Sequence, residues 1–134
     1  MPPKRFSPKD PREWLNRARS NLIQAKEKDP RIYLEDRCFS AQQAAEKAIK
    51  ALLLHHGLRF PHIHDLSELL KLLKEAGGDI PAEVLDAREL SNYAVVTRYP
   101  GPAEPVTQKE YRAAVKMAEE VVKWAEKIIL AKRR

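Results

Sequence analysis

The sequence contains a single cysteine, only four glycines and no long apolar run. One cysteine excludes an internal disulfide and favours a reducing, cytoplasmic location. No stretch approaches the roughly 20 apolar residues that span a bilayer, and Met1 to Phe6 lead into polar sequence instead of an apolar signal core. Strict alternation of apolar and polar residues is also missing, so no half-buried strand is predicted. These absences indicate a soluble, all-helical chain without membrane contact.

The composition is that of one globular domain. The chain has 134 residues, of which 43% are hydrophobic and 33% charged. This length suffices for a single core, so we expect one domain over residues 1–134 with its core at about 10–130. The net charge of +6 mildly favours anionic partners such as nucleotides or RNA.

The most informative stretch runs from Cys38 to Leu54. Small or apolar residues recur here every three or four positions, which predicts a seam where a neighbouring helix packs closely: Leu34, Cys38, Ala41, Ala45, Ala48 and Leu52. Beside this seam, Gln42 and Glu46 interrupt a second apolar stripe, and polar groups on a half-buried face need partners. We therefore assign Gln42, Glu46 and the adjacent Lys47 to a cleft or an interface, and we interpret Cys38 as a buried small hydrophobe.

Start and stop signals divide the chain into five predicted helices. Asp10 with Glu13 resembles a capping box for the first helix, and Gly57 ends the second, which is the longest. Further helices are predicted over about 65–76, 81–98 and 107–131, while both chain ends are expected to be loose. Four long helices and one short one, joined by short turns, predict an antiparallel up-and-down four-helix bundle with one additional short helix.

Two tyrosines and an arginine cluster near the end of the fourth predicted helix. Arg98 offers a planar set of donors that suits phosphate, and Tyr93 and Tyr99 offer ring faces for stacking on a base. These three residues are the predicted nucleotide- or phosphate-binding site. The alternative is structural, with the tyrosines packing and Arg98 pairing with a carboxylate or a helix-end carbonyl.

Other chemical motifs are weak. His55, His56, His62 and His64 lie within ten residues, but no carboxylate or thiolate completes a recognised ligand spacing, so we predict no metal site. The sequence has no glycine-rich phosphate loop and no nucleophile elbow, and no cofactor is predicted. The basic residues form no dense block, and Lys47 and Lys50 are interpreted as part of a solvated helix face.

Several segments together resemble the HEPN domain of prokaryotes. The most specific is the run from Gln42 to Lys50, followed by the turn from Thr97 to Pro100, and the His64-Asp65-Leu66 start is weaker. The resemblance covers roughly residues 10 to 130. It implies a helical bundle that pairs as a homodimer and binds nucleotide or RNA. Small stand-alone members often act with a separately encoded minimal nucleotidyltransferase in toxin–antitoxin pairs.

Many members of that family cut RNA without a metal, using an arginine followed after four to six residues by a histidine on a late helix. This chain has no histidine after Arg98, and the pair Arg59 and His64 has the spacing but lies in a predicted loop. No catalytic residue is therefore assigned. A metal-independent cut also needs a group that takes the 2′-hydroxyl proton, and no such group follows Arg98.

The sequence is compatible with three functional hypotheses. The first is a HEPN module that binds nucleotide or RNA and works with a minimal nucleotidyltransferase. The second is a metal-independent endoribonuclease toxin, and the third is a purely structural dimerisation module.

Overall fold

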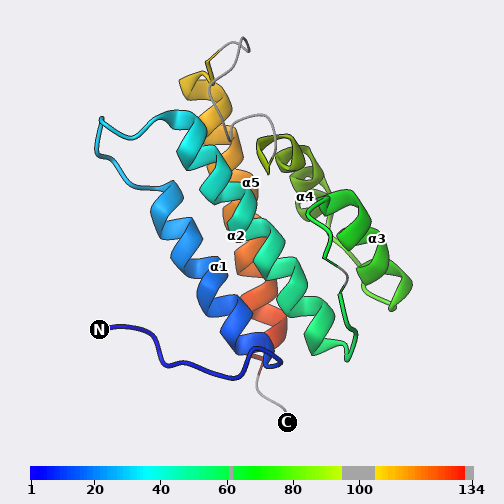
Figure 1. The fold of residues 1–134 in the computed structure, drawn as a ribbon. Coiled ribbons are helices and arrows are strands. Elements are labelled where there is room, and N and C mark those ends of the chain that lie inside the picture. Colours follow the sequence, from blue (N-terminus) through cyan, green and yellow to red (C-terminus); the bar gives the residue numbers. More distant parts are fainter. Residues whose placement is uncertain (61, 95–104, 132–134) are drawn as a thin grey trace.

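The structure, a computed structural model, describes residues 1–60, 62–94 and 105–131 (Figure 1). Within these residues the chain forms helices and no strand, which confirms the all-helical prediction. Its elements are α1 (Pro11–Ala25), α2 (Leu34–His55), α3 (Leu66–Glu75), α4 (Ala82–Leu85), the 3₁₀ helix η1 (Asp86–Ala94) and α5 (Gln108–Ile129). The long helices α1, α2 and α5 pack against one another, and α3 and η1 contact α2 as well. None of the described helices combines the length and apolar content that crossing a membrane requires.

The helix α2 is the centre of this bundle. The predicted seam is confirmed for five of its six residues, because Cys38, Ala41, Ala45, Ala48 and Leu52 are completely buried, whereas Leu34 at the start of α2 is only partly buried. Small side chains along one helix face allow the backbones of neighbouring helices to approach closely, and the interior is filled at crystal-like density. Burial extends around α2 beyond this seam, to Ala44, Ile49 and Leu53, and the helix contacts α1, α3, α5 and η1 at once.

Local signals set the predicted ends of two long helices. Thr107 and Glu110 form a full capping box before α5, with each side chain accepting a hydrogen bond from the other residue's backbone N–H. At the end of α2, Gly57 adopts a φ of 77°, and the Leu58 N–H donates to the Leu53 carbonyl at 2.9 Å. This is a Schellman-type helix end, which requires the left-handed conformation that glycine adopts without strain.

The segment after Pro81 differs from the single α-helix that the sequence predicts. One turn of α-helix, α4, passes into the nine-residue 3₁₀ helix η1. Val84, Ala87 and Leu90 are buried and Tyr93 packs against the core, each three residues after the last. A 3₁₀ helix has three residues per turn, so this spacing places Ala87, Leu90 and Tyr93 of η1 in one row facing the core, after Val84 of α4.

The N-terminal segment is held against α1, which corrects the expectation of a loose end. Asp10 caps α1 as predicted, but Glu13 does not complete a capping box. Its Oε1 instead accepts a hydrogen bond from the Phe6 N–H at 2.9 Å, and Asn16 Nδ2 donates to the Lys4 carbonyl at 2.8 Å. The residues before α1 are therefore held against that helix by hydrogen bonds.

Candidate functional site: a polar cluster on the central helix

Three polar side chains follow one buried stripe of α2. Gln42, Glu46 and Lys50 are spaced four residues apart and are 0%, 3% and 5% exposed. Glu46 accepts a hydrogen bond from Gln42 Nε2 at 3.0 Å and forms an ion pair with Lys50 Nζ at 3.1 Å. Gln43 Nε2 in turn donates to Gln42 Oε1 at 2.7 Å. We call Gln42, Glu46, Lys50 and His64 the α2 cluster. Its members are hydrogen-bonding partners of one another, which satisfies the buried polar groups of Gln42 and Glu46.

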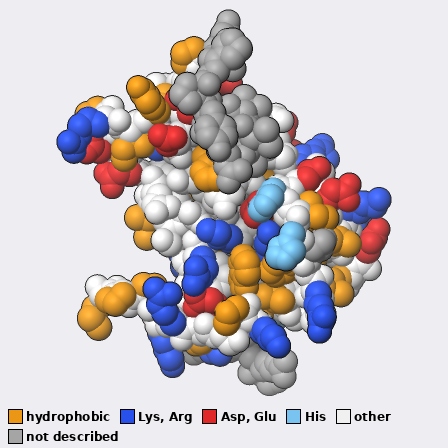
Figure 2. All heavy atoms as spheres, in the orientation of Figure 1, with side chains coloured by type: hydrophobic (Ala, Val, Ile, Leu, Met, Phe, Trp, Pro, Cys, Tyr) orange, Lys and Arg blue, Asp and Glu red, His pale blue; other side chains and the backbone are white. Residues whose placement is uncertain are grey.

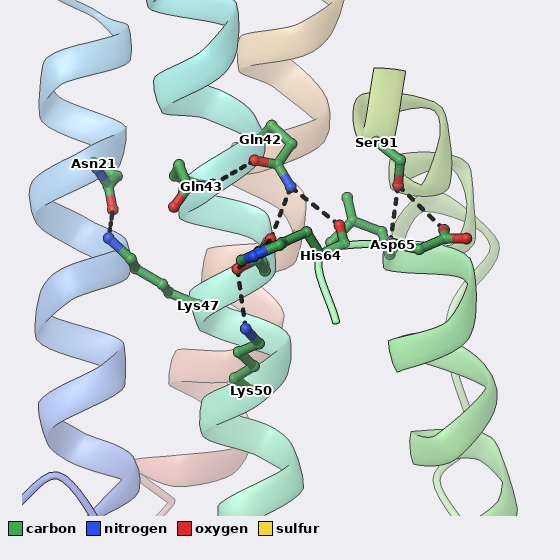
Figure 3. Close-up of polar contacts among 10 residues, drawn as sticks. Asn21, Gln42, Gln43, Lys47, Lys50, His64, Asp65 and Ser91 are labelled. Atoms are coloured by element: carbon green, nitrogen blue, oxygen red, sulfur yellow. Dashed lines mark hydrogen bonds and ion pairs between the residues drawn. The ribbon is translucent and has the colours of Figure 1, made fainter. Parts of the chain in front are cut away.

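His64 joins the cluster from the segment that precedes α3 (Figure 3). Its Nδ1 lies 3.1 Å from both carboxylate oxygens of Glu46, and its backbone carbonyl accepts from Gln42 Nε2 at 3.4 Å. The side chain of His64 is 69% exposed. An ionised carboxylate only accepts hydrogen bonds, so Nδ1 carries the hydrogen, and Nε2 has no partner among the described residues. A buried carboxylate therefore orients an exposed histidine.

Lys50 is buried, which corrects the prediction that it belongs to a solvated helix face. Its Nζ lies 5.2 Å from the ring centre of Phe60 and 6.0 Å from that of Trp14. The two rings meet edge to face at 4.9 Å. Both the Glu46 carboxylate and the ring faces favour the ammonium charge in this position.

Lys47 points to the other side of α2, toward α1 (Figure 3). It is half-buried, and its Nζ donates to Asn21 Oδ1 at 2.7 Å. Burial lowers the pKa of Lys47, although the neighbouring Glu46 carboxylate opposes that shift. Because no carboxylate forms an ion pair with Lys47 in the described part of the chain, its charge is available to an anion.

The end of η1 lies beside the α2 cluster. Ser91 Oγ accepts a hydrogen bond at 2.9 Å from the N–H of Leu66. Leu66 lies two residues after His64 in the sequence. The side chain of Tyr93 hydrogen-bonds with Cys38, one turn before Gln42, and burial raises the pKa of Tyr93. The other two residues of the predicted binding site, Arg98 and Tyr99, lie outside the described residues.

Cys38 is a structural residue of the core. It is completely buried, and burial raises the pKa of its thiol to about 12, with Glu35 and Glu110 contributing in the same direction. The nucleophilic form is the thiolate, so this cysteine stays protonated near neutral pH. Nor does the described part of the chain bring together three histidine, cysteine or acidic side chains that could hold a metal ion.

The fold and the cluster define a helical-bundle domain whose central helix carries buried polar side chains. The family model of the HEPN domain matches residues 11–128, and the chain belongs to the HEPN family, which is associated with nucleotide and RNA binding. A search of curated proteins finds no significant match to the chain.

Two solved structures share this fold. TT1696 from Thermus thermophilus is 34% identical, covers 87% of this chain and 96% of its own, and superposes with a TM-score of 0.74. ST0689, an archaeal HEPN homologue, is 27% identical, covers 90% of this chain and 98% of its own, and gives a TM-score of 0.72. Both similarities extend over nearly the whole domain.

Proposed function

We propose that this protein binds nucleotide or RNA at the end of η1, with Arg98 on a phosphate and Tyr93 and Tyr99 beside it. The observation that carries the proposal is that η1 packs on α2 and that its Ser91 accepts a hydrogen bond from the Leu66 N–H, close in sequence to His64 of the α2 cluster. Arg98 follows Ala94 by four residues, a span of at most about 14 Å of extended chain. Family membership and the net charge of +6 support an anionic ligand of this class.

Replacing Arg98 with alanine is expected to weaken RNA or nucleotide binding by at least about tenfold, because a hydrogen bond to a charged group contributes about 1.5–3 kcal/mol. Titration of labelled single-stranded RNA and of ATP, followed by fluorescence anisotropy and calorimetry, measures the loss. Arg112→Ala is the matched control, since Arg112 is exposed on α5 and forms no ion pair among the described residues. Equal affinities of Arg98→Ala and the unchanged protein would remove Arg98 from the site.

We further propose that the protein acts as a homodimer and as the partner of a minimal nucleotidyltransferase in a toxin–antitoxin-type pair. Family membership supports both proposals, and two large apolar side chains, Ile23 and Tyr33, are 71% and 75% exposed. Sedimentation at micromolar concentration is expected to give twice the chain mass of 15.4 kDa. A monomer contradicts the homodimer, whereas a dimer that binds neither nucleotide nor RNA favours the purely structural module.

A second candidate function, RNA cleavage, is favoured by the pairing of His64 with Glu46. The orientation of an imidazole by a buried carboxylate is the arrangement that prepares a histidine as a general base. In such a cut, His64 Nε2 takes the 2′-hydroxyl proton, the 2′-oxygen attacks phosphorus, and the 5′-oxygen leaves and receives a proton from water. The products carry a 2′,3′-cyclic phosphate and a 5′-hydroxyl, which identify the reaction when purified protein is incubated with RNA in EDTA.

A further inference from the structure

A pocket of about 250 Å³ lies where the N-terminal segment meets α1 and α2. It is separate from the end of η1, and its lining combines cations with aromatic rings: Arg5, Phe6, Pro8, Glu13, Trp14, Arg17 and Lys47. Ligand pockets for small molecules commonly measure about 300–1,000 Å³, so this one lies slightly below that range. Its size suits a single small ligand, not an extended one.

The pocket is built by contacts that fix its outer wall. The Phe6 N–H donates to Glu13 Oε1 at 2.9 Å, and Trp14 Nε1 donates to the Pro8 carbonyl at 2.7 Å. The guanidinium of Arg12 lies 4.1 Å from the ring centre of Phe6. Because these bonds hold the N-terminal segment in place without a ligand, the pocket is largely formed before binding, which reduces the entropy cost of association.

The charge of the lining is positive despite its one carboxylate. Arg5, Arg17 and Lys47 are cationic, and both oxygens of Glu13 are already engaged by the Phe6 N–H and by Arg17 Nε at 2.7 Å. The hydrogen bond from Phe6, followed by that from Arg17, lowers the pKa of Glu13 below its ordinary value. The carboxylate therefore stays ionised and neutralises one of the cations. Three cations and one carboxylate leave two positive charges for a ligand to balance.

Two of the cations have unused capacity. Arg17 donates to Glu13 through Nε alone, and its terminal nitrogens form no hydrogen bond with the described residues. Lys47 Nζ has only the neutral Asn21 oxygen as a partner, and burial together with the nearby charges of Arg17 and Lys50 disfavours its protonated form. An anion placed between Arg17 and Lys47 accepts hydrogen bonds from the terminal nitrogens of Arg17 and favours the protonated form of Lys47.

The aromatic walls provide the second half of the recognition. The rings of Phe6 and Trp14 both line the pocket, and Trp14 is braced edge to face against Phe60. A base stacked on an aromatic side chain contributes about 1–3 kcal/mol to binding. Figure 2 shows lysine and arginine side chains gathered beside hydrophobic ones on this face of the molecule.

We infer that this pocket binds a 5′-phosphorylated nucleotide, with its phosphate held by Arg5, Arg17 and Lys47 and its base against Phe6 or Trp14. The choice of ligand rests on the proposed nucleotide- or RNA-binding function, but the site uses none of the residues proposed for it. A free nucleotide and the 5′-phosphorylated end of an RNA strand present the same chemistry to these groups.

Calorimetric titration with AMP tests the inference, with adenosine and inorganic phosphate as ligands that lack one half of the recognition. AMP is expected to bind at least about tenfold more tightly than either fragment, and Arg5→Ala and Lys47→Met are each expected to weaken AMP by about tenfold. Arg112→Ala removes the same charge at the opposite end of the bundle and is expected to leave AMP binding unchanged. In a Trp124→Phe background, quenching of the remaining indole by AMP reports on Trp14 directly.

The comparison with Arg98→Ala separates this pocket from the site at the end of η1. If Arg5→Ala and Lys47→Met bind AMP within twofold of the unchanged protein, or adenosine binds as tightly as AMP, the pocket assignment is overturned even when Arg98→Ala weakens RNA binding. If Arg5→Ala and Lys47→Met weaken AMP binding while Arg98→Ala binds RNA as tightly as the unchanged protein, the pocket assignment stands and the Arg98 site fails. A 5′-phosphorylated RNA tetranucleotide that binds more tightly than AMP, with the same loss in Arg5→Ala, identifies a strand end as the source of the phosphate.

Discussion

Replacing Glu46 with leucine is expected to lower the free energy of unfolding by about 3–5 kcal/mol, the usual result of removing one partner from a buried ion pair. Glu46 accepts hydrogen bonds from Gln42, Lys50 and His64, and only His64 among these is exposed. The substitution leaves the Lys50 ammonium buried at 5% exposure with ring faces as its remaining favourable contacts. Urea unfolding followed by circular dichroism measures the change.

Two further variants determine whether the loss comes from the unpaired charge. The double variant Glu46→Leu/Lys50→Met is expected to recover most of the stability, because an apolar pair of similar volume replaces both ions. Glu126→Ala is the matched control, since Glu126 pairs with Arg19 at the surface, and its loss is expected to stay below about 1 kcal/mol. If the free energies of unfolding of Glu46→Leu and of the unchanged protein differ by less than about 1 kcal/mol, the buried pair is not a stabilising contact.

Replacing His64 with asparagine is expected to lower the rate of RNA cleavage by about 10²- to 10⁴-fold, the usual contribution of a general base. The asparagine amide nitrogen occupies roughly the position of Nδ1 and keeps a donor toward Glu46, while the Nε2 proton acceptor is lost. Because the His64 side chain is mostly exposed, stability is expected to change by less than about 1 kcal/mol. The measurement is the rate at which cyclic-phosphate ends form in EDTA.

Histidine substitution elsewhere provides the comparison. His56→Asn changes an exposed histidine just after the end of α2 and is expected to leave cleavage unchanged. Retention of full activity by His64→Asn would place the general base elsewhere. If the unchanged protein releases no cyclic-phosphate ends, the endoribonuclease candidate is wrong and the binding function stands without it.

The parts of the fold that the sequence predicted depend on neighbouring residues. The start of the last helix at Thr107 and the helix end at Gly57 each depend on contacts within five residues, and the α2 seam is a periodicity within one helix. The 3₁₀ helix η1 was missed because a spacing of three residues also occurs along one face of an α-helix, although the two periods differ by about half a turn over nine positions. Ser91 also hydrogen-bonds to Leu66, 25 residues away, which a local pattern does not reveal.

The candidate site was predicted in part for the same reason. Gln42 and Glu46 stood out because they interrupt an apolar stripe, but burial of Lys50 depends on Trp14 and Phe60, which come from other segments. The contact of His64 with Glu46 joins residues 18 positions apart and requires the segment after α2 to return along that helix. Only the spacing of four between Glu46 and Lys50 was an available sequence signal for that pair.

The attachment of the N-terminal segment to Glu13 and Asn16 has a practical consequence for anyone who purifies this protein. An affinity tag fused ahead of Met1 begins only four residues before Arg5, so its side chains can reach the pocket at the first turn of α1. Acidic tag residues would occupy the same cations that a phosphate needs. Ligand titrations therefore require that such a tag be cleaved off, because a retained tag acts as a tethered competitor at high effective concentration.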